Sequence, residues 1–156
     1  MTFLCHYAIL KKKTEDCLMS DTVKFVVAQK PFMVAHRGLS GLEQENTHAA
    51  FVAAGNRSYW GIETDIRRTN DGHYVCMHDN TLTRVAGEDF SIEQCSYETV
   101  RSLLLKEKSG EKGRPDIRIP SLEEYVSICK RYNKICVLEL KGTYEEEHLR
   151  EVLSIL

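Results

Sequence analysis

The sequence lacks three features that would each indicate a particular class of protein. It has no excess of basic residues: 21 Lys and Arg stand against 23 Asp and Glu, a formal net charge of −2, so no surplus is available to neutralise a nucleic-acid backbone. No apolar run approaches the roughly 18 residues of a membrane-spanning helix. No internal repeat or low-complexity tract is present. We therefore expect a globular protein that neither spans a membrane nor binds nucleic acid.

Two further absences concern the compartment. None of the six cysteines forms a C-x-x-C pair, which argues against a zinc knuckle or a dithiol redox motif. Cys129 and Cys136 lie in apolar stretches, where a free thiol behaves as a small hydrophobic side chain. A signal-peptide pattern is also missing, because the basic cluster at 11–13 follows a short apolar run instead of preceding it. We expect a cytoplasmic protein in which residues 1–30 are an N-terminal extension and Met19 is an alternative start to Met1.

The chain alternates between strand-like and helix-like segments. Strand patterns occupy 32–36, 61–66, 73–78 and 134–140, and Asn70-Asp71-Gly72 forms a turn between the second and third. The last of these resembles a strand covered on both faces. Helices are predicted after Asn46 or Thr47 as far as Gly55, over 97–105, and after capping boxes that begin at Ser121 and Thr143; residues 106–116 form a surface loop. This alternation predicts an α/β fold of parallel βα units.

Acidic residues are concentrated on two of the predicted strands. Glu63 and Asp65 are two positions apart, so their carboxylates share one face of the second strand. Glu139 occupies the fourth strand, where Lys141 lies on the same face. Carboxylates that point together repel one another unless a proton or cation lies between them. An all-oxygen set of three suits Mg²⁺ or Ca²⁺. The alternative is an ion-pair cluster that lines a polar barrel interior.

Histidine and arginine stand at the ends of predicted strands. His36 and His78 are both followed by polar turns, and histidine suits proton transfer near neutral pH. Arg37 could hold a phosphate through a charge-assisted fork, although a surface salt bridge would use the same residue. Two histidines and an arginine beside a carboxylate set favour a catalytic site over separate structural roles.

The order of these motifs resembles that of the glycerophosphodiester phosphodiesterase family. The motifs are His36-Arg37-Gly38, Glu45-Asn46-Thr47 with Ala50-Phe51, Ile62-Glu63-Thr64-Asp65, Thr69-Asn70-Asp71-Gly72, His78-Asp79 and Leu138-Glu139-Leu140-Lys141. No single motif is decisive, but six in order are specific. The resemblance spans about residues 32–156, and one departure is Gln44, where the family often has proline.

The resemblance implies a metal-dependent enzyme with a (β/α)8 barrel and its active site at the carboxyl ends of the strands. It would hydrolyse a glycerophosphodiester, a small-molecule substrate, to glycerol 3-phosphate and an alcohol, with the glycerol 2-hydroxyl attacking first. By resemblance, Glu63, Asp65 and Glu139 would bind Mg²⁺ or Ca²⁺, and His36 and His78 would be the acid–base pair. Arg37 and Lys141 would hold the phosphate, and Glu45 would orient neighbouring groups such as His36 or the metal shell.

The length of the chain is small for such a barrel. A (β/α)8 barrel takes about 250 residues, whereas residues 31–156 supply about the first four strands and stop within a helical pattern. We expect a domain that is incomplete at its C-terminus, or two half-barrels that complete one another by self-association. The functional alternatives are an inactive fragment, a non-catalytic binding module, and a related phosphodiesterase that acts on lysophospholipids.

Overall fold

The computed structural model describes residues 31–156, so the expectations of an N-terminal extension and of a start at Met19 lie outside the described residues. The elements follow one another as β1 (Val34–Ala35), α1 (His48–Gly55), β2 (Gly61–Arg68), β3 (Tyr74–Cys76), α2 (Thr83–Ala86), the 3-10 helix η1 (Ile92–Gln94), α3 (Tyr97–Ser102), α4 (Leu122–Arg131), β4 (Ile135–Leu140) and α5 (Glu146–Ile155). None of the described helices is long and apolar enough to cross a membrane.

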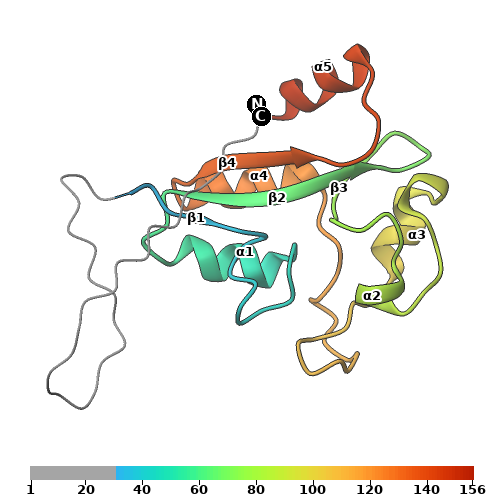
Figure 1. The fold of residues 1–156 in the computed structure, drawn as a ribbon, viewed down its shortest axis with the longest axis horizontal. Coiled ribbons are helices and arrows are strands. Elements are labelled where there is room, and N and C mark those ends of the chain that lie inside the picture. Colours follow the sequence, from blue (N-terminus) through green and yellow to red (C-terminus); the bar gives the residue numbers. More distant parts are fainter. Residues whose placement is uncertain (1–30) are drawn as a thin grey trace, which may run out of the picture. The chain divides into compact units, whose positions relative to one another are not determined.

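The strands form one open sheet with β2 at its centre (Figure 1). β4 runs parallel to β2 along one edge, with Gly61 opposite Ile135 and Asp65 opposite Glu139. The other edge of β2 pairs with β1 in parallel at its start and with β3 in antiparallel at its end. The four expected strands are therefore present. Three are parallel, and β3 is reversed by the predicted turn at Asp71-Gly72, where Gly72 has a φ of +89°.

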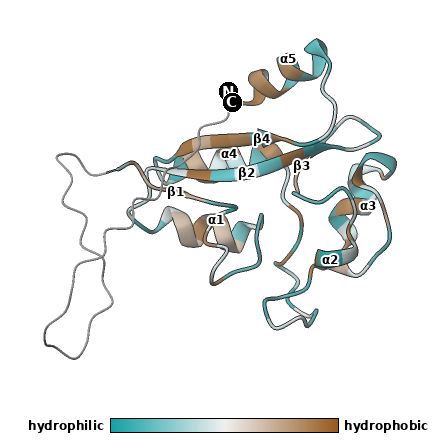
Figure 2. Ribbon diagram, viewed as in Figure 1, coloured by the Kyte–Doolittle hydropathy of each residue, from teal (hydrophilic) through white to brown (hydrophobic). Residues whose placement is uncertain are grey.

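The core lies between the sheet and the helices α1 and α4. In α4 the residues Leu122, Tyr125, Val126 and Cys129 are buried on one face, as their spacing predicts. The expected capping box is also present: the Ser121 hydroxyl accepts from the Glu124 amide, and the Glu124 carboxylate accepts from the Ser121 amide. In Figure 2, β4 is mostly hydrophobic, whereas β2 has hydrophilic stretches that carry its acidic and basic residues.

The segment between β3 and α4 has a small apolar cluster of its own. Its short helices α2, η1 and α3 bury Leu82, Val85, Ile92 and Val100 with the loop residue Ile119. These elements lie beyond the end of the sheet at β3 (Figure 1). The cluster gives the loops that follow β3 a rigid base, which matters because those loops carry several charged residues of the site.

Two local predictions near the C-terminus are wrong. The expected capping box at Thr143 is displaced, because α5 begins at Glu146 with Glu145 as its N-cap and His148 as the reciprocal partner. β4 was expected to be covered on both faces, but Ile135 and Leu140 are 47% and 40% exposed. The reason is that the edge of β4 away from β2 has no partner strand among residues 31–156.

Tyr125 of α4 links the parallel strands β2 and β4 through its hydroxyl group. This contact leads to a prediction about the stability of the fold. Its buried hydroxyl donates to the carbonyl of Ile62 (2.6 Å) and accepts from the amide of Val137 (3.0 Å). We expect Tyr125→Phe to lower the free energy of unfolding by about 1–3 kcal/mol, because both backbone groups lose a partner while buried. Urea unfolding measures the difference. Tyr132→Phe is the control, since the Tyr132 hydroxyl makes no hydrogen bond within residues 31–156; an equal effect in both variants would contradict the prediction.

Candidate active site

The loop after β1 begins the site with an unusual backbone. Arg37 has a φ of +56°, and Gly38 follows with a φ of +75°. A Cβ on Gly38 would stand 2.7 Å from the carbonyl carbon of Ala50, so only glycine lets the loop lie on α1. This turn aims the Arg37 amide at the Glu63 carboxylate, with an N–Oε2 distance of 2.7 Å. His36 is 67% exposed, with its Nε2 3.9 Å from the same Glu63 oxygen.

The three predicted acidic residues lie together. Glu63 and Asp65 share one face of β2, and the parallel register places Glu139 of β4 directly beside Asp65. Carboxylate oxygens of the three residues lie within 4.8 Å of one another. Asp65 is fully buried, Glu63 nearly so, and Glu139 is exposed. The structure thus brings together, on two paired parallel strands, the residues that the sequence grouped.

Two cations and one amide surround Asp65. Arg37 Nε lies 3.2 Å from Oδ2 and Lys141 Nζ 3.3 Å from Oδ1, while Lys141 also contacts Glu139 Oε1 at 2.6 Å. Asn46 donates from Nδ2 to Asp65 Oδ2 (3.0 Å) and accepts from the Thr64 hydroxyl (2.9 Å). Arg37 and Lys141 therefore each contact a different oxygen of the buried carboxylate.

The environment shifts the pKa values of the two buried carboxyls in opposite directions. Burial alone would raise the pKa of Asp65, but the Asn46 hydrogen bond and the charges of Arg37 and Lys141 outweigh it and lower that pKa. Burial raises the pKa of Glu63 above its ordinary 4.5, and the neighbouring Asp65 charge adds to the rise. Glu63 therefore has a charge that a further cation would stabilise.

The donor set fits a divalent cation. Glu63 Oε1 and Asp65 Oδ1 are buried, yet neither makes a well-aligned hydrogen bond within the described residues. Buried carboxylate oxygens without such partners are rare and costly, and a bound ion removes the cost. Three carboxylates against the two cations Arg37 and Lys141 also leave a negative balance. Oxygen-only ligands match Mg²⁺ or Ca²⁺.

His78 reaches the site from the segment after β3. The amide of Met77 donates to the Asp65 carbonyl (2.9 Å). The Arg67 guanidinium donates twice to the His78 carbonyl, from Nε at 3.0 Å and Nη2 at 2.9 Å. These bonds fix the backbone on which the imidazole stands. The ring itself contacts Asp79, with 2.8 Å between His78 Nδ1 and Asp79 Oδ1.

Glu45 has partners other than those expected from the sequence. Its carboxylate accepts from Arg37 Nη1 (3.0 Å) and from both terminal nitrogens of Arg84. Burial opposes ionisation, but these hydrogen bonds and charges lower the pKa of Glu45. Within the described residues the Glu45 carboxylate thus contacts Arg37 and Arg84, and it makes no hydrogen bond to His36.

Sequence reasoning missed two residues of the site. The sequence predicts Asn46 or Thr47 as the helix cap. Thr47 caps α1, whereas Asn46 is buried at a φ of +53° and its amide binds Asp65. An asparagine beside a glutamate in a loop gives a weak signal for this role. Arg84 lies on the short helix α2 and contacts Asp79 and Glu45. No periodicity or spacing in the sequence connects Arg84 with residues near position 45.

The ion pair between Asp79 and Arg84 makes a prediction about pH. The hydrogen bond from Arg84 lowers the pKa of Asp79 from 3.8 to about 2. A lowered carboxyl pKa contributes stability above the unfolded value, and this contribution is lost as the pH falls from 3.8 through about 2. We expect Asp79→Asn to be less stable than the wild type by about 1 kcal/mol at neutral pH, after allowing for solvent screening. Urea unfolding at several pH values should show this gap closing below about pH 4; a constant gap would contradict the assignment.

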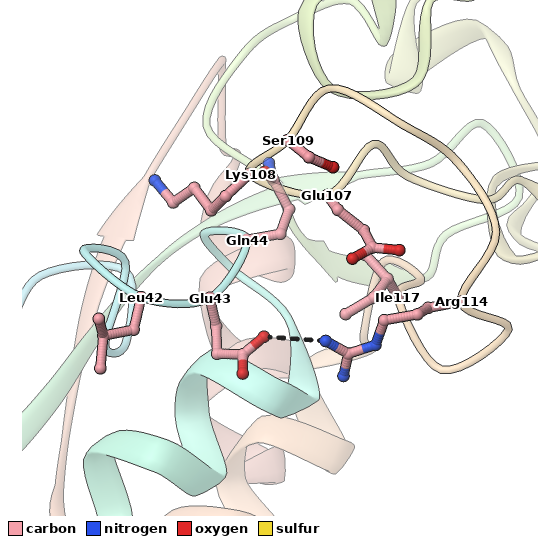
Figure 3. A pocket seen from close by; sticks show the side chains of 8 residues that line it. All are labelled: Leu42, Glu43, Gln44, Glu107, Lys108, Ser109, Arg114 and Ile117. Carbon is pink, nitrogen blue, oxygen red and sulfur yellow. Dashed lines mark hydrogen bonds and ion pairs between the residues drawn. The ribbon is translucent and has the colours of Figure 1, made fainter.

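Two cavities lie near the charged cluster. The smaller cavity, of about 150 Å³, lies between the turn before α1 and the 106–116 loop. Figure 3 shows Glu43 and Arg114 facing each other there, 3.3 Å apart. The other, of about 350 Å³, has Lys141, Arg68 and Tyr144 among its lining residues. Lys141, which also contacts Asp65, is the residue that this cavity shares with the carboxylate cluster.

Comparison with known proteins places these features in one family. Residues 36–153 match the Glycerophosphoryl diester phosphodiesterase family. A mouse glycerophosphodiester phosphodiesterase 1 is 38% identical over 110 residues, which are 70% of this chain and 33% of the mouse protein. A glycerophosphodiester phosphodiesterase from Caldanaerobacter subterraneus is 35% identical over 113 residues, 72% of this chain and 46% of that protein.

Solved structures give the same result for the fold. An Oleispira antarctica phosphodiesterase in complex with the product sn-glycerol-3-phosphate superposes with a TM-score of 0.70 at 28% identity, over 81% of this chain and 51% of that one. A Thermotoga maritima glycerophosphodiester phosphodiesterase gives 0.65 at 29% identity, over 83% and 50%. The chain spans about a third to a half of the lengths of these proteins. The expected incomplete barrel is confirmed: residues 31–156 form an open, four-stranded sheet that matches about half of these barrel proteins.

Proposed function

Because the chain belongs to the glycerophosphoryl diester phosphodiesterase family, we propose that its charged cluster takes part in metal-dependent hydrolysis of a glycerophosphodiester. The observation that carries the proposal is the cluster of Glu63, Asp65 and Glu139, whose buried oxygens include two without an aligned hydrogen bond. Arg37 and Lys141 flank the same carboxylates. Such a combination suits an anionic phosphate beside a cation better than it suits a closed ion-pair network.

The three carboxylates would hold Mg²⁺ or Ca²⁺. When bound, the cation supplies Lewis acidity that offsets the charge of the phosphodiester. Glu63 and Asp65 offer it buried oxygens, and Glu139 offers an exposed one from the neighbouring strand. Asn46 keeps Asp65 oriented through the Nδ2–Oδ2 hydrogen bond. The ligands thus come from two strands whose register fixes them before any ion binds.

Arg37 and Lys141 would hold the phosphate. Arg37 is oriented by Glu45 at Nη1 and by Asp65 at Nε, which directs its guanidinium along one side of the carboxylate cluster. Lys141 approaches from the other side, at the end of β4. Fixed positive groups that face the equatorial oxygens stabilise the charge that develops there during the reaction, because they need no reorganisation when it forms.

His36 and His78 would transfer the protons. One would accept the proton of the attacking glycerol 2-hydroxyl, and the other would donate a proton to the oxygen of the departing alcohol, which leaves a cyclic phosphate. Water would then open this ring, losing a proton to one imidazole while the other returns a proton to the 2-oxygen, and glycerol 3-phosphate would be released. His36 is exposed beside Glu63, and His78 stands on the segment whose amide binds the Asp65 carbonyl. In-line displacement requires an acid and a base on opposite sides of the phosphorus, and the two imidazoles come from segments that follow different strands, β1 and β3.

The substrate class follows from the family and from one relative. The Oleispira antarctica structure holds sn-glycerol-3-phosphate, the product of its own reaction. We propose that this chain releases the same product together with an alcohol such as choline or ethanolamine. The cavity of about 350 Å³ that Lys141 helps to line would offer room beside one of the two residues proposed to hold the phosphate.

The test is an assay with glycerophosphocholine, Mg²⁺ or Ca²⁺, and a chelator as control. We expect glycerol 3-phosphate and choline to appear together, and the release to stop when the chelator removes the cation. The appearance of phosphocholine and glycerol would contradict the proposed direction of cleavage. Release that continues unchanged in chelator would contradict the metal dependence.

A further inference from the structure

Arg84 makes an unusual set of contacts for a residue on a short surface helix. Its Nε and Nη2 donate to the two carboxylate oxygens of Asp79 at 2.6 and 3.1 Å. Its Nη1 and Nη2 donate to the two oxygens of Glu45 at 3.1 and 2.7 Å. One planar guanidinium therefore binds two carboxylates, each through two hydrogen bonds, and the two carboxylates come from segments 34 residues apart in the sequence.

Each of these carboxylates also contacts a residue of the proposed site. Asp79 Oδ1 is 2.8 Å from Nδ1 of His78. Glu45 Oε1 accepts from Nη1 of Arg37 at 3.0 Å. A continuous chain of charged hydrogen bonds thus runs from the His78 imidazole through Asp79, Arg84 and Glu45 to the Arg37 guanidinium.

The base of Arg84 is fixed by packing. Leu82, Val85 and Ala86 are buried around it in the small apolar cluster beyond β3. The arginine head group is half-exposed, yet four hydrogen bonds restrict it. Because its base is rigid and its head group is planar, Arg84 can hold the Asp79 and Glu45 carboxylates at a fixed separation. A lysine could not, because its ammonium group is carried on a flexible stem.

We propose that Arg84 is a positioning residue that sets His78 and Arg37 relative to each other, through Asp79 on one side and Glu45 on the other. This inference rests on the function proposed above for those two residues. Arg84 itself contacts neither the cation ligands nor the phosphate-binding atoms. Its effect passes through the two carboxylates, which hold the imidazole in one orientation and the guanidinium of Arg37 in another.

The arrangement specifies one tautomer of His78. The Arg84 hydrogen bond keeps Asp79 ionised, since it lowers the pKa of Asp79 to about 2, and an ionised carboxylate only accepts hydrogen bonds. The proton must therefore be on Nδ1 of the neutral His78, which leaves Nε2 unprotonated and free to accept a proton. Without Arg84 the Asp79 carboxylate loses two donors and can rotate away from the ring.

Nuclear magnetic resonance tests the inference without requiring turnover. Imidazole and guanidinium ¹H–¹⁵N spectra of the wild-type chain should show His78 as the Nδ1–H tautomer and a slowly exchanging Nη1–H of Arg37, the group that binds Glu45. In Arg84→Gln we expect His78 to become a mixture of tautomers and the Arg37 signal to broaden or disappear. Both signals unchanged in Arg84→Gln, or a change at only one of the two residues, would overturn the proposed bridge.

Arg114→Gln is the matched control. Arg114 is 42% exposed against 49% for Arg84, and it also contacts two carboxylates, Asp116 and Glu43, without contacting His78 or Arg37. We expect its spectra to match the wild type at both residues; the same changes as in Arg84→Gln would overturn the inference. If Arg84→Gln does not fold, Arg84→Lys replaces it. One ammonium cannot bind all four oxygens, so a Lys variant with both signals unchanged would also overturn the inference.

Catalysis provides a second readout that separates this inference from the proposed function. We expect Arg84→Gln to lower kcat/KM for glycerophosphocholine by about 10- to 100-fold. Losses of this size are typical when a residue that orients an active-site group, without touching the substrate itself, is replaced. A wild-type chain that releases no glycerol 3-phosphate would count against the proposed function alone, because the His78 and Arg37 spectra would still decide the role of Arg84. An active Arg84→Gln variant with wild-type kcat/KM would overturn the positioning role.

Discussion

Asp65→Asn should reduce cation-dependent release of glycerol 3-phosphate by about 10³-fold or more, the largest effect expected of any single substitution in this chain. Asp65 is fully buried and contacts Arg37, Lys141 and Asn46. Asparagine keeps the shape but removes the charge that balances two cations and that would bind a third. The measurement is the initial rate with glycerophosphocholine at saturating Mg²⁺ or Ca²⁺.

The control for this substitution is Asp116→Asn. Asp116 forms an exposed ion pair with Arg114 and has no contact with the carboxylate cluster. We expect it to keep the wild-type rate. If Asp65→Asn retained most of the activity of Asp116→Asn while remaining folded, Asp65 could not be a ligand of the reacting centre.

Replacing either proposed proton-transfer residue should give the second largest effect. We expect His36→Gln and His78→Gln each to lower kcat by about 10²- to 10⁴-fold, the usual contribution of a positioned acid or base. Glutamine retains hydrogen-bonding capacity but does not titrate near neutral pH. His36 is exposed and His78 is half-buried, so neither change should unfold the chain. Steady-state kinetics with glycerophosphocholine measure both losses.

His73→Gln is the matched control for these variants. His73 is also partly exposed and also lies beside a carboxylate, since its Nδ1 is 3.5 Å from Asp71. Its ring stacks on Tyr97. His73 lies in the turn between β2 and β3, away from the strand positions that carry the three clustered carboxylates. A similar loss in all three variants would show that glutamine at any of these sites disturbs the fold, and would contradict separate catalytic roles.

The grouping of the carboxylates could be predicted because it depends on two simple periodicities. Alternation along β2 places Glu63 and Asp65 on one face, and parallel pairing brings Glu139 to the same end. The family motifs then supplied His36, His78, Arg37 and Lys141 as neighbours. The structure confirms that Arg37 and Lys141 flank Asp65 and that His36 lies beside Glu63, whereas the roles of these residues stay predictions.

The partners of Glu45 could not be predicted, because they depend on tertiary packing. Arg84 can reach Glu45 because the apolar cluster around Leu82 and Ile92 places α2 against the turn before α1. Asn46 is similar: its left-handed backbone points its amide at Asp65, which a helix-capping pattern does not encode. Sequence spacing specifies which residues share a strand face, but not which loops meet across the sheet.

The coverage of β4 and the start of α5 were mispredicted for different reasons. An apolar pattern shows which side chains of a strand can be buried. The exposure of those side chains depends on which neighbouring elements are present, and β4 has no second partner strand among the described residues. At α5, Thr143 and Glu145 both offer oxygen atoms for capping. The chain uses Glu145 because His148 then completes the reciprocal bond and the Tyr144 hydroxyl can donate to Ile66.

Titration of the chain with Mg²⁺, and separately with Ca²⁺, by calorimetry tests the central claim most directly. The claim is that Glu63, Asp65 and Glu139 form a binding site for a divalent cation. We expect one site in the wild-type chain, the same site in Asp116→Asn, and no detectable binding in Asp65→Asn. A folded wild-type chain that binds neither cation, or an Asp65→Asn variant that binds as tightly as the wild type, would contradict the claim.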